Sequence, residues 1–224
     1  MNARLLGLFS GFPTRHFTDE IARDLREELP RRESLVFISS WPQDEARNDD
    51  DSDGMHGMFA ERSMAFSDHR VIDRRTGAAD AAQLIRTADC VFLMGGDAVS
   101  QMALIRDLGL VPELRASHAV ILGVSAGAMN MGRYAADVWE TKELYEGIGL
   151  TDIVMTGHYT WDAWFIPVLK EMSMTRPIIA MEDESAIFIR GAAAWKIGNI
   201  RWIDRGRITV FTDETLGAIG SSLS

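Results

Sequence analysis

The feature that most limits the possible folds is a regular alternation of short apolar runs with segments of helical character. The apolar runs are rich in β-branched and aromatic residues and cover 5–9, 35–39, 90–94, 120–122, 153–155 and 178–181. Helix signals lie between them, such as Thr18-Asp19-Glu20, a cap followed by an acidic first turn. Strands that alternate with helices form a parallel sheet covered by helices on both faces. We therefore expect an α/β fold of three layers around a mostly parallel, doubly wound sheet.

The pattern changes after Ser185. Residues 185–211 read as several short strands, with turns at Gly191, Gly198 and Gly206. This spacing favours an antiparallel meander at one edge of the sheet. The length of 224 residues suits one domain with a substantial core. Residues 1–224 are therefore expected to form one α/β domain with an antiparallel C-terminal edge.

One acid-rich stretch, 44–54, resembles a metal loop in its spacing. Asp49, Asp51 and Asp53 have calcium-loop spacing, but Ala60 occupies the position where such a loop needs a bidentate glutamate. We therefore expect an exposed loop after the second strand and no metal site.

A second motif, Gly123-Val124-Ser125-Ala126-Gly127, fits G-x-S-x-G, in which a strand turns sharply into a helix and exposes a serine hydroxyl. The apolar run 120–122 precedes it and a helix-forming stretch, 126–136, follows. The new helix would direct its free N–H groups at the site, which favours an oxyanion there. Ser125 is thus a candidate nucleophile; the alternative is a serine that only caps a helix.

A serine nucleophile needs a base, and one of the five histidines suits that role. Three occupy polar stretches that are expected to be exposed (His16, His56 and His69), and His118 precedes the serine's strand and so should lie at the opposite end of the sheet. His158 follows the run 153–155, at the carboxyl edge that Ser125 shares and where ligands bind in such folds. His158 is therefore the candidate base, with a purely structural histidine as the alternative.

An acid that orients the histidine should lie on the same edge. Asp183 qualifies, because it follows the run 178–181, and so do Asp137 and Glu140 beyond the helix that starts at the serine. Spacing alone does not choose among the three.

A glycine turn ends the run 90–94, directly before the serine's strand. Backbone N–H groups at Gly95 or Gly96 could supply half of an oxyanion hole, with the N–H of Ala126 as the other half. The alternative is an ordinary strand-to-helix turn capped by Asp97.

Composition limits the kinds of molecule that this protein is expected to bind. A net charge of −10 argues against nucleic acid and anionic membranes, which need clustered Lys and Arg. The single cysteine, Cys90, excludes an internal disulfide and multi-cysteine metal sites, and its apolar run favours a buried thiol. No run of about 20 apolar residues occurs, and the first ten residues do not read as a signal peptide. We expect a cytoplasmic protein that acts on small molecules or peptides, without metal or organic cofactor; its oligomeric state is left open, a homodimer being one option.

Four stretches resemble the peptidase E and cyanophycinase family of serine peptidases, which shares the flavodoxin-like fold of class I glutamine amidotransferases. They are FLMGGDAVSQM at 92–102, GVSAGAMNMG at 123–132, YEGIGLTDIVMTGHY at 145–159 and IIAMEDESAIFI at 178–189, in the family's order. The resemblance spans about 5–206. It implies Ser125 as nucleophile, His158 as general base, and amides near Gly95 and Ala126 as the oxyanion hole.

The resemblance points to two places for the third member. Cyanophycinase-like members carry an acid in the turn that matches MEDES, which implies Asp183. Peptidase E places an aspartate between serine and histidine, which implies Asp137 or Glu140. Asp183 is the assignment that we carry forward.

These features predict a serine peptidase that cleaves small peptides, including dipeptides, through an acyl-enzyme. The alternatives are a non-catalytic binding protein with the same fold and an esterase-like hydrolase. Family members that cleave after aspartate are expected to hold the acidic side chain with basic residues beyond the histidine, and here none occurs between His158 and Lys170. Trp161, Trp164 and Phe165 stand there instead, where they either line the cleft or form the core face of a helix. Unless a cation from elsewhere, such as Arg133, restores acid recognition, aspartyl dipeptides should be poor substrates.

Overall fold

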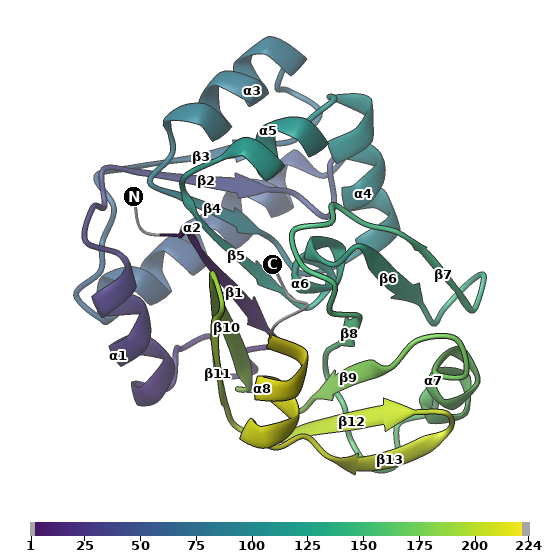
Figure 1. The fold of residues 1–224 in the computed structure, drawn as a ribbon. Helices are drawn as coiled ribbons and strands as arrows, with labels where there is room; N and C mark the ends of the chain where they lie inside the picture. Colours follow the sequence, from purple (N-terminus) through teal and green to yellow (C-terminus); the bar gives the residue numbers. More distant parts are fainter. Residues whose placement is uncertain (1–2, 221–224) are drawn as a thin grey trace.

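The computed structural model describes residues 3–220 and contains a seven-stranded sheet (Figure 1). The strand order is β11-β10-β1-β5-β4-β2-β3. The five strands from β1 to β3 in this order run parallel, and β10 and β11 add an antiparallel edge. The strands are β1 (Leu5–Phe9), β2 (Ser34–Ile38), β3 (Asp68–Ile72), β4 (Cys90–Leu93), β5 (Val120–Val124), β10 (Ala186–Arg190) and β11 (Ala193–Ile197).

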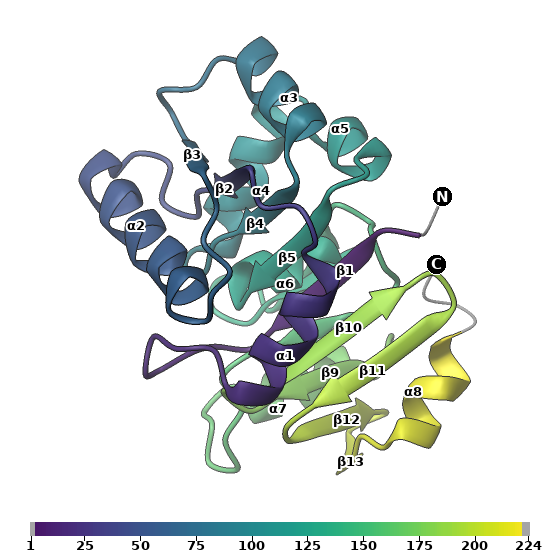
Figure 2. The same cartoon turned by 90° about the vertical axis from the view of Figure 1, so that its left-hand side faces the viewer.

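Helices cover both faces of this sheet, because alternate residues of the parallel strands point to opposite sides. Leu8, Val91 and Ile121 pack in a core beneath α3 (Ala78–Thr87), α4 (Ala98–Asp107), α5 (Val111–Ala116) and α6 (Ala126–Met131). Phe9 and Phe92 pack in a second core beneath α1 (Asp19–Glu28) and α2 (Glu45–Glu61). Figure 2 shows α1 and α2 on the side of the sheet opposite to α3 and α5. The three-layer α/β architecture predicted from the alternation is confirmed.

A smaller sheet and a hairpin adjoin the large sheet at its carboxyl edge (Figure 1). The smaller sheet has the order β13-β12-β9-β8, in which β8 and β9 run parallel. Its helix α7 packs Leu169 and Met172 against Ile178 and Ile203. The elements are β8 (Met155–Thr156), β9 (Ile178–Met181), β12 (Ile200–Asp204), β13 (Arg207–Val210), α7 (Ile166–Met172), α8 (Asp213–Gly220), and the hairpin β6 (Tyr134–Asp137) with β7 (Glu143–Glu146). The predicted C-terminal meander is therefore divided between two sheets.

The acid-rich segment 44–54 is a helix, so the expectation of an exposed loop was wrong. Asp44 caps α2 by accepting the N–H of Arg47 at 3.2 Å. A buried amide then fixes the helix, since Asn48 donates to the Trp41 carbonyl and to Asp73, both at 3.1 Å, and accepts from the hydroxyl of Ser39. These polar contacts form only in the folded protein. The segment lacks the apolar stripe that would have indicated a helix in the sequence.

The helix after the serine is also shorter than expected. It ends at Met131 instead of continuing to 136, because Gly132 pairs with Thr151 and the chain then enters β6. A side chain at Gly132 would lie 2.7 Å from the carbonyl oxygen of Tyr134. The close approach of backbone segments at this glycine therefore sets the end of the helix.

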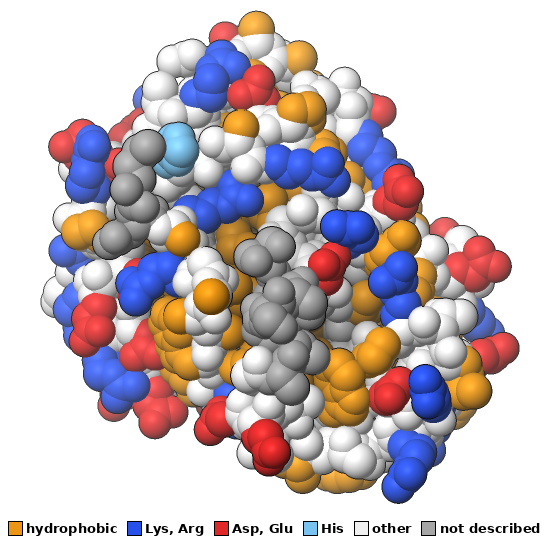
Figure 3. All heavy atoms as spheres, in the orientation of Figure 1, with side chains coloured by type: hydrophobic (Ala, Val, Ile, Leu, Met, Phe, Trp, Pro, Cys, Tyr) orange, Lys and Arg blue, Asp and Glu red, His pale blue; other side chains and the backbone are white. Residues whose placement is uncertain are grey.

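The surface carries mixed charge. Figure 3 shows Lys and Arg intermixed with Asp and Glu over one face, with no single basic surface. Within residues 3–220, no helix has both the length and the apolar character that a bilayer crossing requires.

Candidate active site

Ser125 lies at a sharp turn between β5 and α6. Its backbone has φ 50° and ψ −114°, an unusual conformation for a residue with a side chain. The N–H of Ser125 donates to the Phe9 carbonyl at 2.9 Å, which continues the pairing of β1 with β5. A Cβ at Gly123 would lie 2.7 Å from the backbone of Gly127, and one at Gly127 would overlap the backbone of Leu93. The two glycines of the motif are therefore steric requirements of this turn.

His158 lies beside Ser125, although it comes from the smaller sheet. We expected His158 to follow a strand of the serine's own sheet; instead it follows β8, two residues past Thr156. Asp183 likewise lies two residues past the end of β9. Because β8 and β9 are parallel neighbours, their carboxyl ends bring the two side chains together.

The three side chains form a continuous hydrogen-bonded chain. His158 Nε2 lies 3.0 Å from Ser125 Oγ, and His158 Nδ1 lies 2.7 Å from Asp183 Oδ1. With Asp183 ionised, Nδ1 carries the proton and donates it to the carboxylate, which leaves Nε2 free to accept the serine proton. This is the order of contacts that acyl transfer by a serine requires.

The alternative acids have other partners. Asp137 accepts hydrogen bonds from the N–H groups of Trp139, Glu140 and Thr141 and from the Thr141 hydroxyl, at 3.0 to 3.1 Å. Burial acts to raise the pKa of Asp137, but these hydrogen bonds outweigh it and lower the pKa below its ordinary value. Asp137 thus stabilises the loop between β6 and β7. Glu140 is exposed. Within residues 3–220, the hydrogen-bond partners of the His158 ring are Ser125 and Asp183, not Glu140.

Two residues at the end of β1 hold the histidine and the acid, and sequence reasoning missed both. The buried Ser10 hydroxyl accepts the His158 N–H at 2.8 Å and donates to the Met181 carbonyl at 2.9 Å. It therefore ties the large sheet to the ends of β8 and β9, and it fixes His158 at a positive φ of 55°. Gly11 follows, and a Cβ there would lie 2.5 Å from Asp183 Oδ1. The available signal was the pair Ser-Gly directly after a strand, at the edge where ligands bind.

The glycine turn after β4 lies next to Ser125. Gly96 has φ +136°, a conformation that disfavours other residues, and it lines the same cavity as Ser125 and Ala126. The Ser40 hydroxyl donates to the Gly95 carbonyl, which fixes the Gly95–Gly96 peptide. A Cβ at Gly95 would lie 3.6 Å from Ser125 Cβ, but Gly95 lines a different, smaller cavity.

The cavity at Ser125 has a volume of about 690 Å³, within the range of small-molecule sites. Its walls combine aromatic and apolar side chains with three carboxylates, and no Lys or Arg lies among the described residues that line it. The aromatic side chains are Trp41, Trp139, Tyr145 and Phe165, and the carboxylates are Asp97, Asp137 and Glu140. The site is therefore apolar and acidic in character.

The model of peptidase family S51 matches residues 53–197, about two thirds of the chain and most of the site. The chain belongs to peptidase family S51. It is a serine-type peptidase, related to peptidase E, and its substrates are peptides.

Two solved structures share the fold of this S51 peptidase. A peptidase from an acI-B1 Actinobacterium is 15% identical, with a TM-score of 0.74 over 94% of this chain and 95% of its own. A candidate peptidase E from Listeria monocytogenes EGD-e is also 15% identical, with a TM-score of 0.64 over 87% of this chain and 98% of its own. No curated protein matches the sequence at a significant level.

In the S51 peptidase, the aromatic residues after His158 do not form one face of a helix, which is the arrangement that their spacing favoured. The core-face interpretation is wrong for the two tryptophans, because α7 begins at Ile166 and Trp161 and Trp164 are 66% and 52% exposed, whereas Phe165 packs partly against the core of the smaller sheet. Phe165 lines the cavity, and Trp164 packs against Trp139 of the cavity wall with ring centroids 4.6 Å apart. An aromatic rim therefore borders the cleft.

The candidate cation and the single cysteine of the S51 peptidase both lie outside the cavity at Ser125. Arg133 pairs with Asp152 at 2.9 Å on the surface and does not line the cavity. Cys90 is fully buried in β4, where burial, with a contribution from Asp89, raises the pKa of its thiol. Within residues 3–220, no three His, Cys, Asp or Glu side chains come together in a geometry suited to a metal ion.

Proposed function

We propose that this S51 peptidase hydrolyses small peptides with Ser125 as the nucleophile, His158 as the general base and Asp183 as the residue that orients the base. The observation that carries the proposal is the chain of hydrogen bonds from Ser125 Oγ to His158 Nε2, and from His158 Nδ1 to Asp183 Oδ1. Each contact falls within the distance that proton transfer or orientation needs.

In the proposed reaction, Ser125 Oγ attacks the carbonyl carbon of the scissile bond while His158 Nε2 takes the hydroxyl proton. His158 then gives this proton to the leaving amine as the carbon–nitrogen bond breaks, which leaves an acyl-enzyme on Ser125. Water, activated by His158, hydrolyses the ester and restores the serine. Asp183 stays ionised throughout and stabilises the imidazolium that forms.

The tetrahedral intermediate carries a negative oxygen that needs donors. We assign this role to the N–H groups of Gly96 and Ala126, whose residues share the cavity with Ser125. Gly95 contributes through its carbonyl, which the Ser40 hydroxyl holds and which thereby orients the N–H of Gly96.

The cleft favours apolar over acidic side chains of the substrate. A substrate carboxylate that enters the cavity loses its hydration. It would then lie near the carboxylates of Asp97 and Glu140, and no Lys or Arg is among the described lining residues to compensate its charge. Phe165 and Trp139 offer apolar contact instead. Substrate preference is therefore expected to differ from that of relatives that cleave after aspartate.

Kinetics of two variants test this function against a non-catalytic binding protein with the same fold. Ser125→Ala and His158→Ala should each lower kcat for a peptide by about four orders of magnitude or more, and the double variant should be no slower than the slower single one. Circular dichroism should show an unchanged fold. A Ser125→Ala variant as active as the wild type would remove the serine from the mechanism, and a folded wild type without turnover would favour the binding protein.

A further inference from the structure

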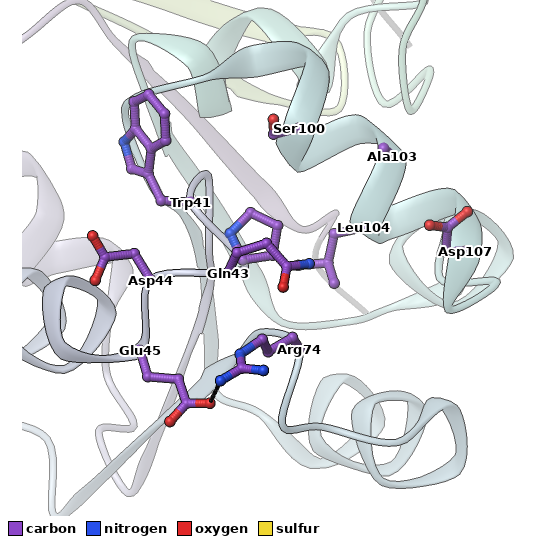
Figure 4. Close-up of a pocket in the computed structure, with 10 residues that line it drawn as sticks. Trp41, Gln43, Asp44, Glu45, Arg74, Ser100, Ala103, Leu104 and Asp107 are labelled. Carbon is purple, nitrogen blue, oxygen red and sulfur yellow. Dashed lines mark ion pairs between the residues drawn. The ribbon is translucent and has the colours of Figure 1, made fainter.

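A second hollow adjoins the cleft at Ser125, and the proposed chemistry does not use it. It has a volume of about 780 Å³ and lies between the segment 41–45 that follows β2, Arg74 after β3, and one side of α4 (Figure 4). Trp41 and Ser100 line this hollow and the cleft at Ser125 alike. The two spaces therefore meet at a shared wall, and we call the second one the α4 groove.

The cleft and the α4 groove together exceed what a small substrate needs. Each of the two spaces alone falls in the range of about 300–1,000 Å³ that one small ligand occupies. An extended peptide advances by about 3.3–3.6 Å per residue, so two or three further residues span a distance of about 7–10 Å. A dipeptide held at Ser125 would lie within the cleft and leave the α4 groove free.

The walls of the α4 groove suit a peptide backbone, which presents both N–H donors and carbonyl acceptors. Gln43 and Ser100 can each donate and accept, and the exposed Asp107 accepts. Arg74 supplies further donors; it forms an ion pair with Glu45 at 2.6 Å beside the groove (Figure 4). Apolar contact comes from Leu104 and Ala103 on α4.

We propose that the α4 groove binds the continuation of the peptide chain beyond the residues at Ser125, so that peptides longer than dipeptides are the better substrates of this enzyme. The inference rests on the proposed function at Ser125 and adds its substrate class. Trp41 lies at the boundary of the two spaces, where the guanidinium of Arg47 stacks over its ring at 4.6 Å.

A length series tests the proposal. Leu-Leu is compared with two tetrapeptides, Leu-Leu-Ala-Ala and Ala-Ala-Leu-Leu, with cleavage at the Leu–Leu bond followed by mass spectrometry. The wild type should show a kcat/KM at least tenfold higher for one tetrapeptide than for the dipeptide. Ala103→Trp places a large ring in the α4 groove from an exposed helix position, and it should remove this gain while it leaves kcat/KM for Leu-Leu within twofold.

Ala79→Trp is the matched control, because Ala79 is an exposed alanine of α3 outside both spaces. It should change neither rate.

Binding to the Ser125→Ala variant separates failure of the α4 groove from failure of the chemistry. Calorimetry should show tighter binding of the preferred tetrapeptide than of Leu-Leu, and Ala103→Trp in the same background should abolish the difference. Equal affinities for the dipeptide and both tetrapeptides would overturn the proposal, and so would a gain with length that Ala103→Trp leaves intact. Tight, length-dependent binding without any turnover by the wild type would instead overturn the function at Ser125 and leave the groove standing.

Discussion

Gly11→Ala is expected to misplace the histidine and the acid of the site without unfolding the protein. The new methyl group would lie 2.5 Å from Asp183 Oδ1 and 2.9 Å from His158 Nδ1. Ordinary non-bonded contacts begin at about 3.5 Å, so the pair must move by roughly 1 Å. The backbone at Gly11 cannot easily yield instead, since its carbonyl accepts the Glu184 N–H at 2.8 Å.

The size of the effect follows from this displacement. A misplacement of about 1 Å at a reacting group costs on the order of 100-fold in rate, so kcat/KM should fall by about that factor. Gly11 does not lie in the left-handed region, so alanine can adopt its backbone conformation. The melting temperature should therefore change by only a few degrees, because the clash is with side chains that are partly exposed.

Steady-state kinetics and thermal unfolding of the same samples provide the assay. Gly57→Ala is the matched control, since a Cβ at Gly57, within α2, would have no neighbour within 4 Å. It should leave kcat/KM unchanged and stabilise the protein by roughly 0.5–1 kcal/mol. A Gly11→Ala variant with the melting temperature and kcat/KM of the wild type would refute the packing argument.

Two further predictions concern the acid and the substrate. Asp183→Asn should lower kcat by about four orders of magnitude, because the amide no longer holds the required tautomer of His158, whereas Glu140→Gln should change it by less than threefold; the opposite ranking in steady-state assays would move the orienting role to Glu140. Aspartyl dipeptides should be poor substrates, since three carboxylates and no Lys or Arg lie among the described lining residues; a kcat/KM for Asp-Leu tenfold above that for Leu-Leu would show that a cation reaches the cleft.

Strand positions could be predicted from the sequence because the parallel strands are buried on both faces and so read as apolar runs. The predicted bounds of β1 and β9 match the structure, and those of β2 and β4 differ by one residue. β3 was not predicted, since this edge strand begins with Asp68, His69 and Arg70 and lacks an apolar run. The sequence likewise predicts a loop over 44–54, where the first part of α2 lies, because buried polar contacts and not an apolar stripe hold this segment.

The candidate site was predictable to the extent that it depends on strand ends. Ser125, His158 and Asp183 each lie two or three residues after an apolar run, and carboxyl ends of parallel strands gather at one edge. The choice of Asp183 over Asp137 could not come from spacing, because it depends on the pairing of β8 with β9. The roles of Ser10 and Gly11 could not be predicted from spacing either, since they arise from contacts between distant parts of the chain, such as Ser10 with His158, 148 residues apart.

The central claim is that His158 and Asp183 make Ser125 a nucleophile, and covalent labelling tests it most directly. A fluorophosphonate reacts with an activated serine, and mass spectrometry of the digested protein locates the adduct. We predict stoichiometric modification at Ser125, lost in Ser125→Ala and slowed by orders of magnitude in His158→Ala. Folded wild-type protein that stays unmodified, or that is modified at another residue, would contradict the account.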